Sequence, residues 1–152
     1  MTPTRIARRV VTDRLGLIDE LLRDIRSLPL NDRHLFLCDR RNVWTAESCL
    51  RRILEALLDL GRHILARGYG SGVSEYKEIA AKLHEHGVLS AQESGVVRLL
   101  AGYRNRMVHF YHEVSVDELY EICAQQLDDV ELVQQGFRRS LREHPEKPDQ
   151  AL

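Results

Sequence analysis

Apolar residues recur along this chain at the intervals of three and four that place side chains on one face of an α-helix. The first such run extends from Ile6 to Ile25, with arginines and acids filling the other face. The segment SLPLND, residues 27–32, ends this run, because Pro29 disfavours helical geometry at Leu28. A second run covers about residues 43–66, so the first half of the chain predicts two long amphipathic helices.

Turn signals then predict a short helix followed by another long one. The segment RGYGSGVS, residues 67–74, carries three glycines, and Ser74 is placed to cap a short helix that runs to about His86. Ser90 and Glu93 have the spacing of a capping box, which predicts a long helix from Ala91 to about residue 111.

Ser115 and Glu118 repeat that spacing and predict a last helix that continues through Phe137. No run shows the alternation of a β-strand, and no internal repeat occurs. The predicted fold is therefore all-α, an antiparallel helical bundle of about four long helices plus a short one. Residues 1–142 are expected to form this single domain, and residues 143–152 are expected to be a flexible tail.

Composition narrows the functional classes. The chain has 152 residues, 43% of them hydrophobic, which suits one ordinary core. Its 22 basic and 23 acidic residues nearly cancel, so nucleic acid would have to bind a local cluster. The three cysteines show neither a CxxC nor a Cys/His pattern, so no metal site, disulfide framework or cofactor is expected. No segment has the length of a transmembrane helix, and a cytoplasmic protein without a membrane partner is expected.

One stretch, GYRNRMVHFYHEV at residues 102–114, combines groups suited to phosphate chemistry. Arg104 can bind a phosphate through two parallel hydrogen bonds, and His109 can exchange a proton near neutral pH. Asn105 can orient the imidazole, and Tyr111 can hydrogen-bond to a phosphate or stack on a base. In an ideal helix Arg104 and His109 point about 140° apart, so they meet only if the arginine bends around or the helix loosens near its end.

Such groups suffice for metal-independent RNA cleavage, in which a base activates the ribose 2′-hydroxyl and a cation stabilises the charge that develops at the phosphate. An arginine and a histidine near a helix C-terminus also complement the helix dipole, and spacing alone favours that structural interpretation. Asp59 and Arg62, on the helix predicted over residues 43–66, are interpreted first as an exposed ion-paired face and second as support for the same cleft.

A family resemblance shifts this balance toward the functional interpretation. The segment RNRMVHFY, residues 104–111, resembles the signature of the HEPN superfamily, and its Arg-x4-His-x-Tyr spacing is similar to that of HepT-like toxins. The likeness extends along most of the chain, in residue type and order, through the segments ILEALLDLGRHILARGYG, YKEIAAKLHEHGVLS and LLAGYRNRMVHFYHEVSVDELYEI.

The resemblance implies a HEPN-like homodimer whose two motifs face one cleft, acting as the endoribonuclease toxin of a type VII-like HEPN/MNT toxin–antitoxin system. It implies that Arg104 and His109 are catalytic and that Asn105 supports them. It also implies that a minimal nucleotidyltransferase antitoxin silences the toxin by AMPylation of Tyr111, using ATP. The cleaved RNA, whether tRNA or mRNA, is left open. Phe110 departs from the family's usual polar residue, and we expect it to pack in the dimer seam.

The sequence leaves a second functional class open. HEPN-like bundles also occur as non-catalytic binding modules that dock a minimal nucleotidyltransferase partner or help bind its substrate. Intact Arg104, Asn105, His109 and Tyr111 favour the enzyme over this alternative, but the same residues suit recognition of a nucleotide or an antitoxin surface. A purely structural helical dimer is the third interpretation, and it ranks last.

Overall fold

The computed structural model describes residues 5–150 of the chain. These residues form seven helices: α1 (Arg8–Arg26), α2 (Arg33–Leu37), α3 (Arg40–Tyr69), α4 (Tyr76–Glu85), α5 (Ala91–Met107), α6 (Val116–Gln125) and α7 (Leu127–Glu143). Within the described range no β-strand forms, and strand-like pairing is limited to two isolated bridges, Ile6 with Pro148 and Phe110 with Val114. The all-α prediction is confirmed.

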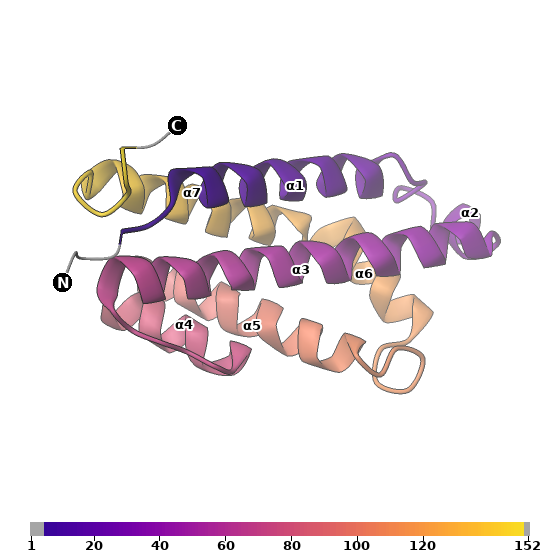
Figure 1. Ribbon diagram of the computed structural model, residues 1–152. Coiled ribbons are helices and arrows are strands. Elements are labelled where there is room, and N and C mark those ends of the chain that lie inside the picture. Colours follow the sequence, from indigo (N-terminus) through magenta and orange to yellow (C-terminus); the bar gives the residue numbers. More distant parts are fainter. Residues whose placement is uncertain (1–4, 151–152) are drawn as a thin grey trace.

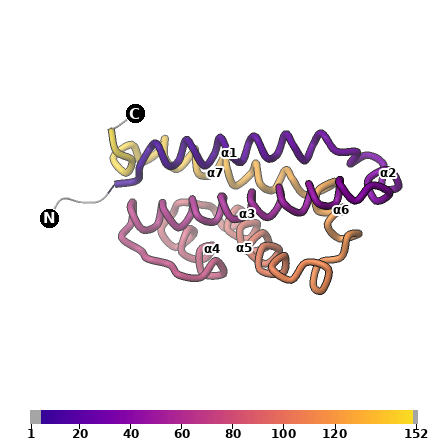
Figure 2. Tube along the Cα trace, turned by 45° about the vertical axis from the view of Figure 1, so that its right-hand side comes forward, coloured from indigo at the N-terminus to yellow at the C-terminus, as the bar shows by residue number. Residues whose placement is uncertain are grey.

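The long helices α1, α3, α5 and α7 alternate in direction along one common axis (Figure 1). The central and longest of them is α3, with 30 residues. Helices α1 and α7 lie on one side of it, and α4 and α5 lie on the other (Figure 1, Figure 2). Because α3 contacts α1, α4, α5 and α6 directly, it is the common partner that places the elements of the candidate site.

Helix α3 begins earlier and ends later than its hydrophobic run predicts. The carboxylate of Asp39 accepts a hydrogen bond from the backbone N–H of Arg41, which caps the helix ahead of the predicted start at Val43. At the other end Gly70 has φ = 62°, a left-handed conformation that glycine adopts without steric cost. Capping residues at both ends therefore extend the helix beyond its apolar stripe.

The connection between α1 and α3 contains α2, a short helix that the sequence pattern does not predict. The side chain of Asp32 caps it by accepting a hydrogen bond from the N–H of Leu35, and Phe36 is fully buried. Tyr120 of α6 packs against Phe36 with ring centroids 5.1 Å apart, and its hydroxyl donates to the carbonyl oxygen of Leu30. These aromatic contacts close the end of the bundle toward which α5 runs (Figure 1).

The predicted cap of the short helix α4 is wrong. The helix begins at Tyr76, its N-cap is Glu75, and Ser74 makes no capping hydrogen bond. The Tyr76 hydroxyl donates to Asp59 Oδ1 of α3 at 2.7 Å, so the first residue of α4 is held by a tertiary contact. The start of α4 therefore coincides with this tertiary contact and not with a side-chain cap.

Both predicted Ser/Glu pairs do start a helix, but they differ in detail. The Ser90 hydroxyl accepts a hydrogen bond from the N–H of Glu93 while Glu93 Oε1 accepts one from the N–H of Ser90, so the capping box of α5 is confirmed. Ser115 caps α6 in the same way, but the carboxylate of Glu118 pairs with Arg106 and does not return to the cap.

The last predicted helix is divided into two. Helix α6 ends at Gln125 and α7 begins at Leu127, with Gln126 at φ = −121° between them. The hydroxyl of Tyr103, on α5, donates to Gln126 Oε1 at 2.8 Å. The prediction of a continuous helix through Phe137 is wrong, and the break coincides with a tertiary contact at a place where the sequence has neither glycine nor proline.

The described part of the predicted tail returns to the start of the chain. The N–H of Ile6 donates to the carbonyl oxygen of Lys147 at 3.0 Å, and the Lys147 ammonium donates to the carbonyl oxygen of Gly68 at 2.9 Å. Pro148 is buried beside them. Flexibility of residues 143–152 stays a prediction, and these contacts lie at the end of the bundle away from the C-terminus of α5 (Figure 1).

Candidate functional site

The motif helix α5 ends at Met107, before the histidine, and not near Tyr111 as the sequence predicts. The N–H of His109 donates to the carbonyl oxygen of Arg106, and the N–H of Glu113 donates to the carbonyl oxygen of His109, so tight turns follow the helix. Arg104 and Asn105 are therefore helical, whereas His109 and Tyr111 lie in a turn segment. The angular separation expected from an ideal helix does not apply across this boundary.

Arg104 is held in place mainly by an aromatic ring. Its Cζ atom lies 4.8 Å from the ring centroid of Tyr76, a cation–π distance, and its Nη2 atom lies 3.6 Å from Glu55 Oε1. The arginine side chain is 28% exposed. Among the described residues its guanidinium makes no hydrogen bond, and its buried Nε atom has no acceptor. The buried Nε atom is closed to a ligand, so the terminal nitrogens, which make no hydrogen bond among the described residues, are the donors that an anion can reach.

Arg106, two positions further along the same helix, is held quite differently. Its guanidinium donates to both carboxylate oxygens of Glu118, at 2.7 and 2.6 Å, and also to the carbonyl oxygen of Glu113. The paired guanidinium holds the pKa of the Glu118 carboxyl below its ordinary value. Arg106 thus joins α5 to α6 and fastens the turn segment, which leaves Arg104 as the arginine of the motif with uncommitted donors.

Arg104 and Asn105 line a cavity of about 450 Å³, together with Arg62, Ser74, Glu75, Tyr76 and Lys77. We call this the arginine cavity. Its walls come from the second half of α3, the start of α4 and the last turns of α5. Arg104 and Asn105, two of the predicted site residues, both line this cavity, whereas Tyr76 and Lys77 were not predicted as members of the site.

His109 does not line the arginine cavity within one chain. Its side chain is 64% exposed, and its Nε2 atom lies 3.9 Å from Glu113 Oε2. An imidazole with this exposure is accessible to a substrate. Arg104 and His109 are thus presented on successive segments, one on a helix and one on a turn, and no hydrogen bond or ion pair joins them in the described part of a single chain.

Tyr111 has an unusual backbone conformation for its residue type. Its φ is 74°, in the left-handed region, and its N–H donates to the carbonyl oxygen of Val114. The side chain is 63% exposed, and its ring lies 4.3 Å from that of Phe110, centroid to centroid. Tyr111 lines a separate cavity of about 490 Å³ with Trp44 and Arg40, among others. Its hydroxyl is therefore presented to solvent beside an exposed tryptophan.

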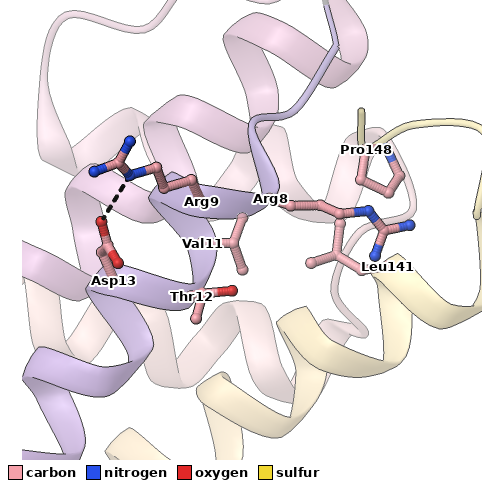
Figure 3. Close-up of a pocket in the computed structure, with 7 residues that line it drawn as sticks. All are labelled: Arg8, Arg9, Val11, Thr12, Asp13, Leu141 and Pro148. Atoms are coloured by element: carbon pink, nitrogen blue, oxygen red, sulfur yellow. Dashed lines mark ion pairs between the residues drawn. The ribbon is translucent and has the colours of Figure 1, made fainter. Parts of the chain in front are cut away.

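A further cavity, of about 510 Å³, is drawn in Figure 3. It lies at the end of the bundle where α1 begins, whereas α5 ends at the other end (Figure 1). It is bounded by the first turns of α1, with Arg8 and Val11, and by Leu141 and Pro148 near the C-terminus. Arg8 donates to the backbone and side chain of Asp149, so its polar groups hold the chain ends together. This cavity lies between the first turns of α1 and the residues at and after the end of α7, and none of the motif residues lines it.

The described part of the chain contains neither a candidate metal site nor a candidate membrane-spanning helix. Between residues 5 and 150, no group of three or more His, Cys, Asp and Glu side chains is placed to hold a metal ion. Among the same residues no helix is long and apolar enough to span a bilayer.

Comparisons with known proteins agree with this picture of the fold. A family model described as "Ribonuclease HepT-like" matches residues 18–135, which include the motif segment. A tri-AMPylated HEPN toxin of Shewanella oneidensis in complex with MNT antitoxin has a TM-score of 0.76 at 19% identity, covering 86% of this chain and 97% of that chain. A toxin–antitoxin crystal structure with AMP-PNP has a TM-score of 0.75 at 18% identity, covering 84% and 97%.

A third similar structure is YutE of Bacillus subtilis, a cytosolic protein of unknown function, with a TM-score of 0.74 at 17% identity over 92% of this chain and 94% of that one. A comparison with curated proteins gives no significant match.

Proposed function

Because the chain belongs to the HepT-like ribonuclease family, we propose that it is the toxin of a HEPN/MNT toxin–antitoxin pair and a metal-independent endoribonuclease. The observation that carries this proposal is the state of Arg104. Its guanidinium is positioned by Tyr76 and Glu55, lines an open cavity and keeps its hydrogen-bond donors uncommitted. A guanidinium held in this way is preorganised to bind a phosphate, because little side-chain entropy remains to be lost.

In the proposed reaction, neutral His109 removes the proton from a ribose 2′-hydroxyl, and that oxygen attacks the adjacent phosphorus. The bond from phosphorus to the 5′-oxygen of the next nucleotide breaks, and that oxygen takes a proton from water, which leaves a 2′,3′-cyclic phosphate and a 5′-hydroxyl. Protonated His109 then returns its proton to the solvent. Arg104 stabilises the negative charge on the non-bridging oxygens as the pentacovalent state forms. Asn105, which shares the cavity with Arg104, is proposed to support the bound phosphate.

A homodimer completes this site. Among the described residues His109 is not in the wall of the arginine cavity, so Arg104 is proposed to act on a phosphate approached by His109 of the partner subunit. Exposed apolar side chains in the middle of α5 and just after its end support such pairing, since Leu99 is 45% exposed and Val108 is 57% exposed.

Regulation is proposed to act through Tyr111. The phenolic oxygen would attack the α-phosphorus of ATP bound to the MNT antitoxin, forming a tyrosine–AMP phosphodiester and releasing pyrophosphate. The exposed hydroxyl suits such a transfer. The adduct adds bulk and negative charge close to His109, which would repel the phosphates of RNA.

The test is RNA cleavage by purified protein in the presence of EDTA, with His109→Ala compared with His112→Ala. Both histidines are exposed in the same turn segment, so His112→Ala is a matched control. We expect His109→Ala to lower the cleavage rate by about 100-fold or more and His112→Ala to leave it nearly unchanged. Undiminished cleavage by a folded His109→Ala variant contradicts the mechanism. If folded wild-type protein cleaves no RNA yet binds the MNT partner, the non-catalytic binding module replaces the enzyme.

A further inference from the structure

A second arginine shares the ring that holds Arg104. The Cζ atom of Arg62, on α3, lies 4.7 Å from the ring centroid of Tyr76, nearly the same distance as that of Arg104. Tyr76 therefore gathers cations from α3 and α5 at one aromatic ring, and both line the arginine cavity.

The Tyr76 ring is itself fixed. Its hydroxyl donates to Asp59 Oδ1 at 2.7 Å, and the same carboxylate oxygen lies 3.8 Å from Arg62 Nη1. Asp59 and Arg62 are three positions apart on α3, so they occupy adjacent turns of one helix face. The sequence interpretation of this pair as an exposed ion-paired face is therefore incomplete, because the pair is tied to Arg104 through Tyr76.

Arg62 also has uncommitted donors. Its Nη1 atom lies 3.8 Å from Asp59, longer than a hydrogen bond, and its side chain is 39% exposed, so the terminal nitrogens, unlike the buried Nε, can be reached by a ligand. By contrast, Arg139 has a structural role, and it donates to both carboxylate oxygens of Glu93 at 2.6 Å. Arg62 thus resembles Arg104 in its environment and differs from the arginine that joins helices.

Charge in the arginine cavity favours an anion. Its wall includes the cations Arg62, Lys77 and Arg104, one acid, Glu75, and the neutral groups of Ser74 and Asn105. Glu75 lies 3.2 Å from Lys77 and offsets that charge, while Asp59 is not among the residues that form the wall. The carboxylates nearest the two guanidiniums, Asp59 for Arg62 and Glu55 for Arg104, lie outside this wall, so the cations are the charges that the guanidiniums present to the cavity.

We propose that Arg62 binds a second backbone phosphate of the RNA, next to the scissile phosphate at Arg104, and that Tyr76 is the positioning residue for both guanidiniums. This inference rests on the proposed ribonuclease function. Two cations at one ring match the repeated charge of a nucleic-acid strand, and guanidiniums bind phosphate in a directional manner. Arg62 touches RNA away from the reacting atoms, so its contribution is equal in the ground state and the transition state.

Kinetics of Arg62→Ala, with Arg67→Ala as the control, test this assignment. Arg67 is an exposed arginine on the same helix and lies outside the cavity. Arg62→Ala should raise KM about tenfold with kcat nearly unchanged, because a uniformly made contact affects KM alone. Arg104→Ala should instead lower kcat. A fall in kcat for Arg62→Ala, or no change in either constant, overturns the second-phosphate assignment.

A binding measurement without catalysis separates this inference from the proposed function. In the non-cleaving His109→Ala background, Arg62→Ala should reduce the slope of log Kd against log salt for single-stranded RNA by about 0.7, the value for one lost phosphate contact. An unchanged slope contradicts the inference even if wild type cleaves RNA. If wild type does not cleave RNA but Arg62→Ala still reduces the salt slope, the proposed ribonuclease activity is rejected and the phosphate contact of Arg62 is retained.

Tyr76 variants test the positioning role. Tyr76→Phe keeps the ring and removes the hydroxyl, whereas Tyr76→Leu removes the ring. We expect Tyr76→Leu to raise KM and lower kcat together, since both guanidiniums lose their support, and Tyr76→Phe to retain most activity. Thermal melting of each variant shows whether the fold is intact. If folded Tyr76→Leu matches wild type in both constants, the ring does not position the arginines.

Discussion

Arg139 of α7 holds both carboxylate oxygens of Glu93 of α5, each at a distance of 2.6 Å. Glu93 is buried, and the same carboxylate accepts the N–H of Ser90 in the capping box. One side chain therefore starts the motif helix and fastens it to the C-terminal helix. Only the Glu93 end of this ion pair is buried, because the Arg139 side chain is 38% exposed, so its loss removes two charge-assisted hydrogen bonds but leaves an arginine that water can reach.

Glu93→Gln should destabilise the protein by about 2 kcal/mol, since the bidentate ion pair and part of the cap are lost. Urea unfolding at pH 7 measures this change. Glu85→Gln is the matched control, because Glu85 is exposed and pairs with Lys82 at 3.4 Å on the surface. The control should change the free energy of unfolding by less than about 0.5 kcal/mol. If the two substitutions change the free energy of unfolding equally, the Glu93–Arg139 pair contributes no more to stability than a surface ion pair.

The same pair predicts how stability depends on pH. The Arg139 guanidinium, opposed by burial and helped by the Ser90 backbone, lowers the pKa of Glu93 from 4.5 to about 2. A depressed folded pKa contributes stability that is complete above pH 4.5 and is lost as the pH falls toward 2. The stability difference between wild type and Glu93→Gln should therefore shrink between these values. Unfolding curves at several pH values test this, and a difference that is constant with pH rejects the assignment.

The three cysteines should differ sharply in reactivity. Cys38 is exposed, whereas burial raises the pKa of Cys49 and raises that of Cys123 to about 12. A thiol reagent at pH 8 should label one cysteine quickly in the native protein and all three after denaturation. Cys38→Ser should abolish the fast phase. Rapid labelling that persists in this variant would place a second cysteine at the surface.

Tyr111→Phe should separate toxicity from its control. The Tyr111 hydroxyl makes no hydrogen bond with the described residues, so its removal should leave fold and RNA cleavage intact. On the proposed mechanism, induced Tyr111→Phe should arrest growth even when the MNT antitoxin is co-expressed, while wild type is rescued. Intact mass should show AMP on the wild-type protein only. Rescue of Tyr111→Phe together with an AMP adduct would assign the modification to another residue.

Mixing two inactive variants tests the composite site. If Arg104 acts with His109 of the partner subunit, each mixed dimer of Arg104→Ala and His109→Ala contains one intact site. Random mixing should then restore up to about a quarter of wild-type cleavage. Each variant mixed with itself is the control and should stay inactive. No recovery, with exchange of subunits verified by mass, would place both residues in one subunit.

The helical content followed from local signals, because apolar periodicity and the Ser90–Glu93 box are properties of neighbouring residues. The errors fall where tertiary contacts decide. Helix α2 depends on burial of Phe36, and the break at Gln126 coincides with the hydroxyl of Tyr103. The start of α4 at Tyr76 coincides with its hydrogen bond to Asp59. None of these contacts leaves a pattern in the local sequence.

For the candidate site, the motif spacing singled out Arg104, and the structure distinguishes it from Arg106 by its uncommitted donors. The sequence did not identify Tyr76, because its role arises from three helices that meet at one ring. The early end of α5 also went unpredicted. The residues after Met107 include neither glycine nor proline before Ser115, so no local stop signal marks the turn.

That early end has a genetic consequence. His109 stands outside the helices and the core, so on the proposed toxin function its replacement should abolish killing while leaving a folded protein at normal abundance. Replacement of a core residue such as Leu57 should instead lower abundance through degradation. Cells that survive toxin expression would then carry one of two kinds of variant, either a folded but inactive protein or a protein that is degraded. The degraded variants would be recessive to the wild-type gene, and the folded variants would be dominant. The folded, inactive group would still occupy the antitoxin, and in a cell that also carries the active gene it would release the wild-type toxin from control.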